Sequence, residues 1–339
     1  MRLRDVSEGE LLALVLPAYA GTRAAAWGSV PVGPGDDAAV VGAPGGSVVA
    51  TTDTMVRGRD WRDDWSSAFD VGVKVATQNL ADIAAMGAEP TGLLVSLVAD
   101  PETEVEWAVD LARGIASVAT RAGAPVVGGD LSSAPAGVVV VAVTALGDLR
   151  GRRPVLRSGA HVGDVVAVCG SLGLSGGGLL LHERGEGDAV AGERGDAVRA
   201  LLRHHVAPLA PWSAGPRAAD AGAHALIDVS DGLVTDLGRV ASASGVSVDL
   251  DGTVLRERFA AGPLTTALGA DEALHQVLAG GEEHSLVAAF ADEASVPGAL
   301  TDGEEWVVIG RVVVPAADAS LVTVDGVVPD ARGWDHFAG

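Results

Sequence analysis

Acidic residues recur along this chain beside glycine, serine and threonine, at positions expected to end strands or begin helices. A single such residue means little, because aspartate is common in turns and at helix N-caps; Asp231, for example, could simply cap the helix that follows it. As a set, carboxylates with hydroxyl groups nearby are the hard oxygen ligands that Mg²⁺ prefers, and Mg²⁺ also binds phosphate oxygens. The set comprises Asp36 and Asp37 in GPGDDAAVV, Thr51, Thr52 and Asp53 in ATTDT, Asp82 in NLADIAAMGA, Asp130 in GGDLSS, Asp228, Ser230 and Asp231 in IDVSDGL, and Glu282 and Glu283 in GGEEHSL.

Asp82 differs from the others because it lies inside a strongly apolar segment with helical character. Asn79 precedes it by three residues, which places both polar groups on one face of the helix. A carboxylate is costly to bury unless something pairs with it, and no basic residue lies one turn away. A metal ion is therefore a candidate partner for Asp82.

Phosphate binding has no standard loop in this sequence. A P-loop is excluded because Lys74 is the only lysine. The glycine-rich stretch GSLGLSGGGLL lacks the Rossmann pattern and is either a phosphate loop or a tight strand-to-helix turn. GGD at 128–130 and SDGL at 230–233 are better candidates, since a helix N-terminus at 231 would favour phosphate. No catalytic nucleophile is expected, and direct phosphoryl transfer needs none.

Charge and composition narrow the range of partners. The formal net charge of −22, without a compensating basic run, argues against nucleic acid and against anionic membranes. One cysteine, Cys169, makes neither an intramolecular disulfide nor a zinc cluster, and the eight histidines form no HExxH motif. The pair His204–His205 is expected on the solvated face of a charged helix.

The elements that must position these residues alternate loosely between strand and helix, which predicts an α/β protein with mixed sheets. Ser7 and Glu10 form a capping box for a short first helix; the acidic flank is unlike a secretion signal and favours a cytoplasmic protein. A break near 148–160 divides two α/β halves, 1–148 and 149–339. Helices are expected at 66–88, 104–123, up to about 207, and 231–245, and strands at 38–42, 47–56, 92–99, 136–147, 165–170, 223–230, 246–250 and 283–290.

Seven motifs, taken in order, resemble the thiamine-monophosphate kinase family, in its actinobacterial form. They are GPGDDAAVV, TTDTMV, NLADIAAMGA, VVGGDLSS, RSGAHVGD, DVSDGLVTDL and GGEEHSL, and the likeness runs on to GWDHF at 333–337. The resemblance implies the two-domain fold of the aminoimidazole-ribonucleotide-synthetase-like superfamily. Its N-terminal domain, here 1–148, would bind ATP and Mg²⁺ and form a homodimer, beside a C-terminal α/β domain at 149–339. The implied reaction is in-line phosphoryl transfer from ATP to thiamine monophosphate through several Mg²⁺ ions, with K⁺ as a further candidate ion.

The same resemblance implies roles for individual residues. Of the opening pair, the resemblance implies a metal role for Asp37 and none for Asp36. The family often has a histidine near the position of Asp60, and GEEHSL replaces the usual GEDYEL, so the thiamine contacts differ here; Trp61 is a candidate for stacking on a flat ring. The implied metal ligands are Asp37, Thr51, Thr52, Asp53, Asp82, Asp130, Asp228 and Asp231; the ATP contacts are Gly129, Asp130, Arg157 and Ser230; and the substrate contacts are Asp60, Glu282 and Trp334.

Two alternatives to the kinase interpretation remain open. The first is another ATP-dependent enzyme of the same superfamily acting on a different small substrate; a selenophosphate synthetase would need a reactive cysteine near the N-terminus, which is absent. The second is a non-catalytic nucleotide-binding or scaffold protein. Clustered carboxylates without a function would repel one another, which argues against the second alternative.

Overall fold

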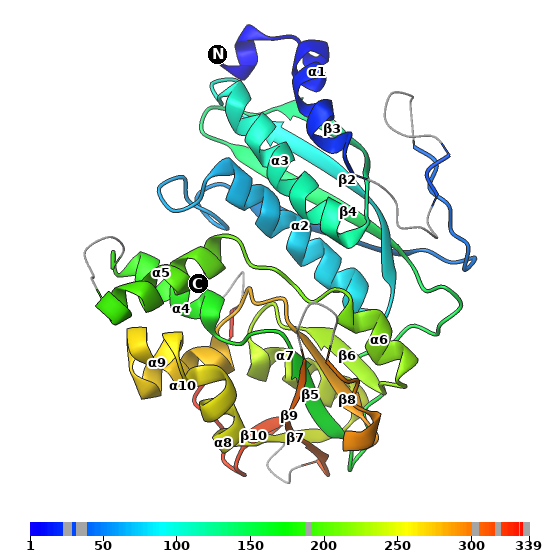
Figure 1. The fold of residues 1–339 in the computed structure, drawn as a ribbon, viewed down its shortest axis with the longest axis vertical. Helices are drawn as coiled ribbons and strands as arrows, with labels where there is room; N and C mark the ends of the chain where they lie inside the picture. The colour runs from blue at the N-terminus through cyan, green and yellow to red at the C-terminus, as the bar shows by residue number, and fades with distance from the viewer. Residues whose placement is uncertain are drawn as a thin grey trace. The chain divides into compact units, whose positions relative to one another are not determined.

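The computed structural model describes residues 1–22, 29–31, 39–186, 192–299, 305–315, 320–331 and 333–334. These residues form two compact units, the first made of residues 1–83 and 88–151, the second of residues 84–87 and 152–339 (Figure 1). Each unit has its own sheet.

Unit 1 is built on a four-stranded mixed sheet in the order β1-β4-β2-β3. β1 and β2 each pair antiparallel with β4, whereas β2 and β3 are parallel. Residues of β4 alternate between buried and partly exposed, as expected for a sheet with one covered face. The strands are β1 (Val49–Val56), β2 (Glu89–Ala99), β3 (Val126–Ser133) and β4 (Val139–Asp148).

The helices of unit 1 begin and end where local sequence signals place them. Ser7 accepts a hydrogen bond from the Glu10 N–H while Glu10 accepts one from the Ser7 N–H, which completes the capping box. Gly123 ends α3 in the left-handed region, at φ 67°. A Cβ at Gly114 would lie 2.1 Å from the carbonyl oxygen of Phe69, so glycine lets α2 and α3 pack closely. The helices are α1 (Glu8–Tyr19), α2 (Ala68–Ala85) and α3 (Val105–Ala122).

Unit 2 contains a six-stranded mixed sheet in the order β10-β7-β9-β5-β8-β6. Only β10 and β7 are parallel among these neighbours; the other neighbouring pairs are antiparallel. The strands are β5 (Val165–Cys169), β6 (Ala225–Asp228), β7 (Ser247–Leu250), β8 (Leu286–Phe290), β9 (Trp306–Val313) and β10 (Val322–Val324).

Both faces of the second sheet are covered, and β5 is buried throughout. Val166 and Val168 belong to a core that includes residues of α4, α5, α7, α9 and α10, whereas Val165, Ala167 and Cys169 join a second core with α6. The helices are α4 (Leu174–Glu183), α5 (Gly192–Val206), α6 (Ala214–Asp220), α7 (Leu233–Ser244), α8 (Gly252–Val254), α9 (Pro263–Leu268) and α10 (Ala270–Ala279).

The predicted two-domain fold with mixed sheets is confirmed, and two predicted strands need correction. Residues 39–42 form no strand beyond a single bridge at Val40. β8 begins at Leu286 rather than 283, because Glu282 and His284 have positive φ angles of 59° and 56°, which are incompatible with a strand. Among the described residues, no helix combines the length and apolarity needed to cross a bilayer.

Candidate active site

In unit 1, Thr51 and Asp53 of strand β1 lie on the sheet face that packs against helix α2. The Thr51 hydroxyl donates to Asp82 Oδ2 at 2.6 Å, and the Asp53 N–H donates to Asn79 Oδ1 at 3.1 Å. Asn79 is fully buried and its side-chain amide donates to the Val75 carbonyl oxygen at 2.8 Å, which fixes the orientation of the amide. Thr51, Asp53 and Asp82, which we call the β1–α2 cluster, therefore lie together, as the metal hypothesis requires.

The strand register places Thr52 and Asp130 on the other face of this sheet. Across the four strands, Asp53 lies in one row of paired residues with Val143, Val95 and Gly129. Asp130 is paired with Ser96, in the next row. Because ladder partners share a face and neighbours alternate, Asp130 points away from the face of Asp53. β1 and β3 are also the two edges of the sheet, about 14 Å apart at the usual strand spacing. Within one chain, unit 1 does not bring Asp130 to the β1–α2 cluster.

Local structure accounts for other residues of unit 1. Asp60 Oδ2 accepts the Val56 N–H at 2.7 Å, so this carboxylate closes its own turn. Trp61 is 3% exposed and stacks on Trp107, at a centroid distance of 6.2 Å. The proposed stacking of Trp61 on a substrate ring is therefore wrong. Asp36 and Asp37 lie outside the described residues.

In unit 2, the turn after β6 gathers two aspartates, Asp231 and Asp236, around Arg239. Asp236, on the first turn of α7, accepts the backbone N–H groups of Ser230, Asp231 and Gly232 at 3.0, 3.0 and 3.1 Å. Arg239 donates to both Asp231 and Asp236. The N-cap of α7 is Gly232, so Asp231 does not cap this helix. The sequence predicts that the backbone N–H groups of this turn bind phosphate, but in the structure they already donate to Asp236.

Burial and the negative charge of Asp228 raise the pKa of Asp236 to about 7. The hydrogen bond from the Asp231 N–H and the charge of Arg239 act in the opposite direction and are outweighed. Asp228 itself ends β6, is 3% exposed, and has Oδ2 3.3 Å from His284 Nδ1. The turn thus concentrates negative charge where a cation would relieve the repulsion.

Glu283 belongs to the GGEEHSL motif, but the sequence does not predict its contacts. The structure shows that it binds the N-terminus of α4. Its fully buried carboxylate accepts the Ser175 N–H at 2.5 Å and the Ser171 hydroxyl at 2.6 Å. His204 Nε2 lies 3.1 Å from the same carboxylate. Glu283 therefore occupies the N-terminus of α4, where the helix dipole favours an anion.

The glycine-rich stretch before and within α4 serves packing. Gly173 is the N-cap, and a Cβ at Gly178 would lie 2.3 Å from the carbonyl oxygen of Leu201 on α5. Of the two alternatives for this stretch, the structure shows the strand-to-helix turn, with Glu283 at the position that a phosphate would need.

The prediction that His204 and His205 form a solvated face is wrong. His205 is 5% exposed, its Nδ1 lies 3.1 Å from Ser175 Oγ, and it is 3.5 Å from Glu282 Oε2. The physical reason is that the last turn of α5 packs on α4, so both imidazoles face inward toward the Glu282–Glu283 loop.

Two of the remaining predicted contacts, Glu282 and Trp334, bind the turn after β6. The Glu282 N–H donates to the Ser230 carbonyl oxygen at 2.7 Å, and the Trp334 N–H donates to the Asp231 carbonyl oxygen at 2.9 Å. The Trp334 side chain is 51% exposed, which leaves indole surface available. Arg157 lies in an exposed loop, and its carbonyl oxygen accepts the Ser244 hydroxyl.

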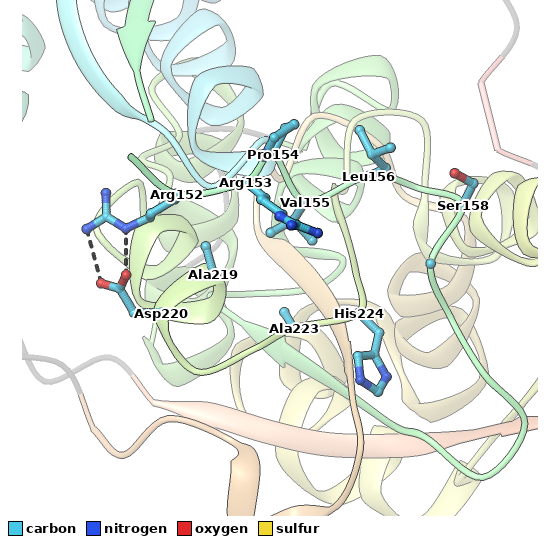
Figure 2. A pocket seen from close by; sticks show the side chains of 11 residues that line it. Arg152, Arg153, Pro154, Val155, Leu156, Ser158, Ala219, Asp220, Ala223 and His224 are labelled. Atoms are coloured by element: carbon cyan, nitrogen blue, oxygen red, sulfur yellow. Dashed lines mark hydrogen bonds and ion pairs between the residues drawn. The ribbon is translucent and has the colours of Figure 1, made fainter. Parts of the chain in front are cut away.

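A cavity of about 490 Å³ lies elsewhere in unit 2 and contains none of the predicted site residues (Figure 2). Its lining includes Arg153, Asp220 and His224, and Arg152 pairs with Asp220 through two hydrogen bonds. The carboxylate clusters, rather than this cavity, hold the oxygen donors suited to metal binding.

Two family models match the chain, the AIR synthase related protein, N-terminal domain, over residues 35–149, and the AIR synthase related protein, C-terminal domain, over 161–320. The thiamine-monophosphate kinase of Mycobacterium tuberculosis is 45% identical over 312 residues, which are 92% of this chain and 85% of the relative. A crystal structure of thiamine-monophosphate kinase from Stenotrophomonas maltophilia matches with a TM-score of 0.77 and 28% identity, covering 95% of this chain and 96% of the other. The structure of AaThiL complexed with AMPPCP and TMP matches with a TM-score of 0.74 and 26% identity, covering 99% of each.

Proposed function

Because the chain belongs to the thiamine-monophosphate kinase family, we propose that it transfers the γ-phosphoryl group of ATP to thiamine monophosphate, giving ADP and thiamine diphosphate. The observation that carries this proposal is the β1–α2 cluster, in which Asp82 and Asp53 lie on one sheet face with the Thr51 hydroxyl. The relative solved with AMPPCP and TMP supports the choice of nucleotide and acceptor.

Mg²⁺ fits the donor set of both units. The β1–α2 cluster offers carboxylate and hydroxyl oxygens, the ligands suited to this ion. In unit 2, the raised pKa of Asp236 marks a crowded group of carboxylates that a divalent cation would stabilise. When bound, Mg²⁺ would neutralise charge on the phosphate oxygens. The proposed ligands are Thr51, Asp53 and Asp82 in the β1–α2 cluster, Asp228 and Asp231 in unit 2, Thr52 and Asp130 on the opposite face of the unit 1 sheet, and Asp37, with K⁺ as a further candidate ion.

The chain's own groups are proposed to position the two substrates. Gly129, Asp130, Arg157 and Ser230 would hold ATP, and Asp60, Glu282 and Trp334 would lie beside thiamine monophosphate. A Cβ at Gly129 would lie 1.9 Å from the Val95 carbonyl oxygen, so only glycine fits this strand position. Trp334 offers an exposed indole that can pack on a heteroaromatic ring.

Transfer is proposed to be direct and in line, without a phosphorylated protein intermediate. Ser175 has an imidazole within hydrogen-bond distance, at His205, but Ser175 is fully buried and its backbone N–H is bound to Glu283. It therefore cannot reach a substrate as a nucleophile. Positioning and charge neutralisation are sufficient for phosphoryl transfer.

We also propose a cytoplasmic homodimer, in which residues 1–148 supply the dimer contact and 149–339 the second α/β domain. Thr52, Thr54, Leu94 and Asp130 are exposed on the sheet face of unit 1 that is opposite the β1–α2 cluster. A second copy against this face would bury it. A cytoplasmic location agrees with ATP as the co-substrate.

The decisive experiment is a discontinuous assay of the purified full-length chain with Mg-ATP and thiamine monophosphate, in which chromatography measures thiamine diphosphate. We expect equal amounts of ADP and thiamine diphosphate, and no product after chelation of Mg²⁺. Thiamine, without a phosphate, serves as the control acceptor. Absence of thiamine diphosphate across a range of Mg²⁺ and K⁺ concentrations would overturn the proposal and favour another acceptor.

A further inference from the structure

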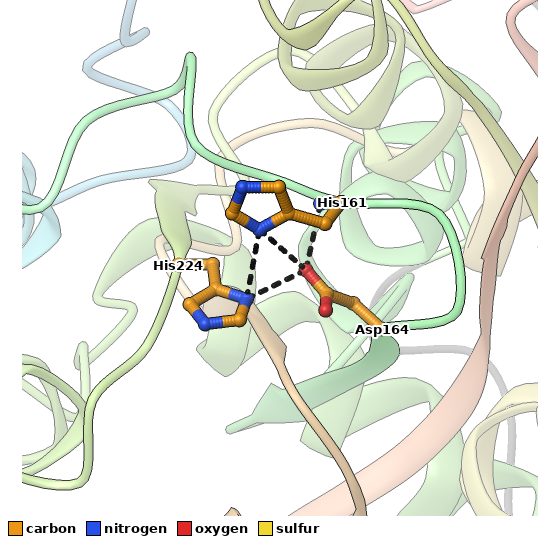
Figure 3. A group of neighbouring side chains, drawn as sticks. All are labelled: His161, Asp164 and His224. Atoms are coloured by element: carbon orange, nitrogen blue, oxygen red, sulfur yellow. Dashed lines mark hydrogen bonds and ion pairs between the residues drawn. The ribbon is translucent and has the colours of Figure 1, made fainter.

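Three side chains outside the candidate active site converge on one point, just before strands β5 and β6 begin. His161 Nδ1 and His224 Nδ1 lie 3.2 Å apart, and Asp164 Oδ2 lies 2.9 Å from His224 Nδ1 and 3.9 Å from His161 Nδ1 (Figure 3). The two rings meet edge to face, at a centroid distance of 4.7 Å. We call these three residues the HDH cluster.

Hydrogen bonds can hold this cluster only in some tautomers. The Asp164 carboxylate only accepts, and each neutral imidazole carries one N–H proton, on one of its two nitrogens. A proton on His224 Nδ1 is shared between Asp164 Oδ2 and the His161 Nδ1 lone pair; with both imidazole protons on Nε2, three lone pairs face one another. A cation at the centre would satisfy all three lone pairs at once.

The geometry points to a binding site for a divalent transition metal, Zn²⁺ in the first place, held by His161, Asp164 and His224. Zn²⁺ binds nitrogen and oxygen at about 2.0–2.1 Å in a tetrahedral arrangement, which sets its ligands about 3.3 Å apart. The distances in the HDH cluster, 2.9, 3.2 and 3.9 Å, bracket this value. Water or an anionic ligand would complete the coordination.

The backbone holds all three ligands in place. The His161 N–H donates to Asp164 Oδ2 at 2.8 Å, and the His161–Asp164 turn is bound to β9 through Gly163 N–H and Val312 N–H. The His224 N–H donates to the Ala289 carbonyl oxygen on β8 at 2.8 Å. The site is thus largely formed before the metal arrives, which lowers the cost of binding.

Metal can reach the cluster from solvent. The His161 side chain is 71% exposed and that of His224 is 32% exposed, whereas Asp164 is 5% exposed. His224 also lines the 490 Å³ cavity of Figure 2. The acidic chain attracts cations generally, but imidazole ligands select transition metals over Mg²⁺.

Titration of the metal-stripped full-length chain with Zn²⁺ in excess Mg²⁺ tests this site, because the excess Mg²⁺ competes with Zn²⁺ for carboxylate ligands but not for imidazole. Isothermal titration should find one tight equivalent of Zn²⁺ in the wild type. His161→Ala and His224→Ala should each weaken it at least about tenfold, as expected for loss of a ligand. His275→Ala removes an exposed histidine of α10 and is the matched control.

A second measurement keeps the result independent of folding. Zn²⁺ should raise the melting temperature of the wild type and of His275→Ala, but not of the other two variants, and all four chains should melt alike without Zn²⁺. Co²⁺ in place of Zn²⁺ should show the visible absorption of a nitrogen-ligated tetrahedral site. Equal Zn²⁺ affinity in all four chains, or no tight equivalent in the wild type, would overturn the inference. Kinase turnover is not the readout, so failure here leaves the proposed function standing.

Discussion

Asp82 and Asp236 are both acids within helices, but their surroundings differ. Asp82 is partly exposed and accepts a hydrogen bond from the Thr51 hydroxyl, whereas Asp236 is 1% exposed and fills a turn with its carboxylate. Asp82 is therefore placed to meet a ligand, and Asp236 to hold the backbone of the Asp231 turn. Substitutions at these two positions should change different properties.

Asp82→Asn should lower the turnover of thiamine monophosphate by roughly a hundredfold, the cost of losing one preorganised electrostatic group. The asparagine amide can still accept from Thr51, so the melting temperature should stay close to that of the wild type. Turnover and circular dichroism are measured on the same preparations, with Asp110→Asn on α3 as the control. Full activity in Asp82→Asn would exclude Asp82 as a metal ligand.

Asp236→Asn should flatten the pH dependence of stability in the metal-free protein. Folding raises the pKa of Asp236 from 3.8 to about 7, so the folded chain keeps this proton where the unfolded chain has lost it. The stabilisation is therefore complete below pH 4 and is lost as the pH rises to about 7, with an order of 4 kcal/mol for such a shift.

Urea unfolding in the presence of a chelator, at intervals from pH 4 to 8, measures the effect of Asp236→Asn. Exposed Asp196 provides the control, because Asp196→Asn should keep the wild-type slope. The same slope in all three chains would show that Asp236 does not titrate in this range.

At the level of elements, local sequence signals predicted the helices of unit 1 well. The capping box of Ser7 and Glu10 and the stop at Gly123 are short-range interactions, so one stretch of sequence contains both partners. The roles assigned to the carboxylate-rich motifs stay a prediction.

Contacts between distant segments could not be predicted in this way. Glu283 reaches Ser175 across 108 residues, and His224 reaches Asp164 across 60. Burial of His205 depends on how α5 packs on α4, which a charged helix sequence does not reveal. The two faces of the unit 1 sheet that separate Asp53 from Asp130 follow from strand order and register, which are also long-range properties.

Glu283→Gln tests the hydrogen bonds that the Glu283 carboxylate accepts at the N-terminus of α4. Loss of the negative charge at the helix N-terminus should lower the free energy of unfolding by about 2 kcal/mol, from the dipole and the charged hydrogen bonds. Thermal and urea denaturation measure this change. Glu293→Gln, at an exposed ion pair with Arg311, should cost less than about 1 kcal/mol; equal effects would contradict the role given to Glu283.

At the scale of the whole molecule, the sheet face of unit 1 that the described residues leave exposed predicts self-association. Leu94→Arg places a charge on this face and should shift the protein from dimer to monomer, as measured by light scattering after gel filtration. Leu209→Arg in unit 2 alters a leucine of similar exposure, 39% against 36%, and should leave the dimer intact. A monomeric wild type, or a dimer unaffected by Leu94→Arg, would rule out this face as the contact.

The burial of one side chain in α2 has a practical consequence for chemical labelling. Lys74 is the only lysine of the chain and is 2% exposed, so its amine is shielded from reagents in solution. Succinimidyl esters should therefore leave Lys74 of the folded chain unmodified and acylate it only after denaturation. Peptide mass mapping of chains labelled with and without urea measures this difference. The reactivity of one amine can thus report the unfolding of α2 without a cysteine being introduced.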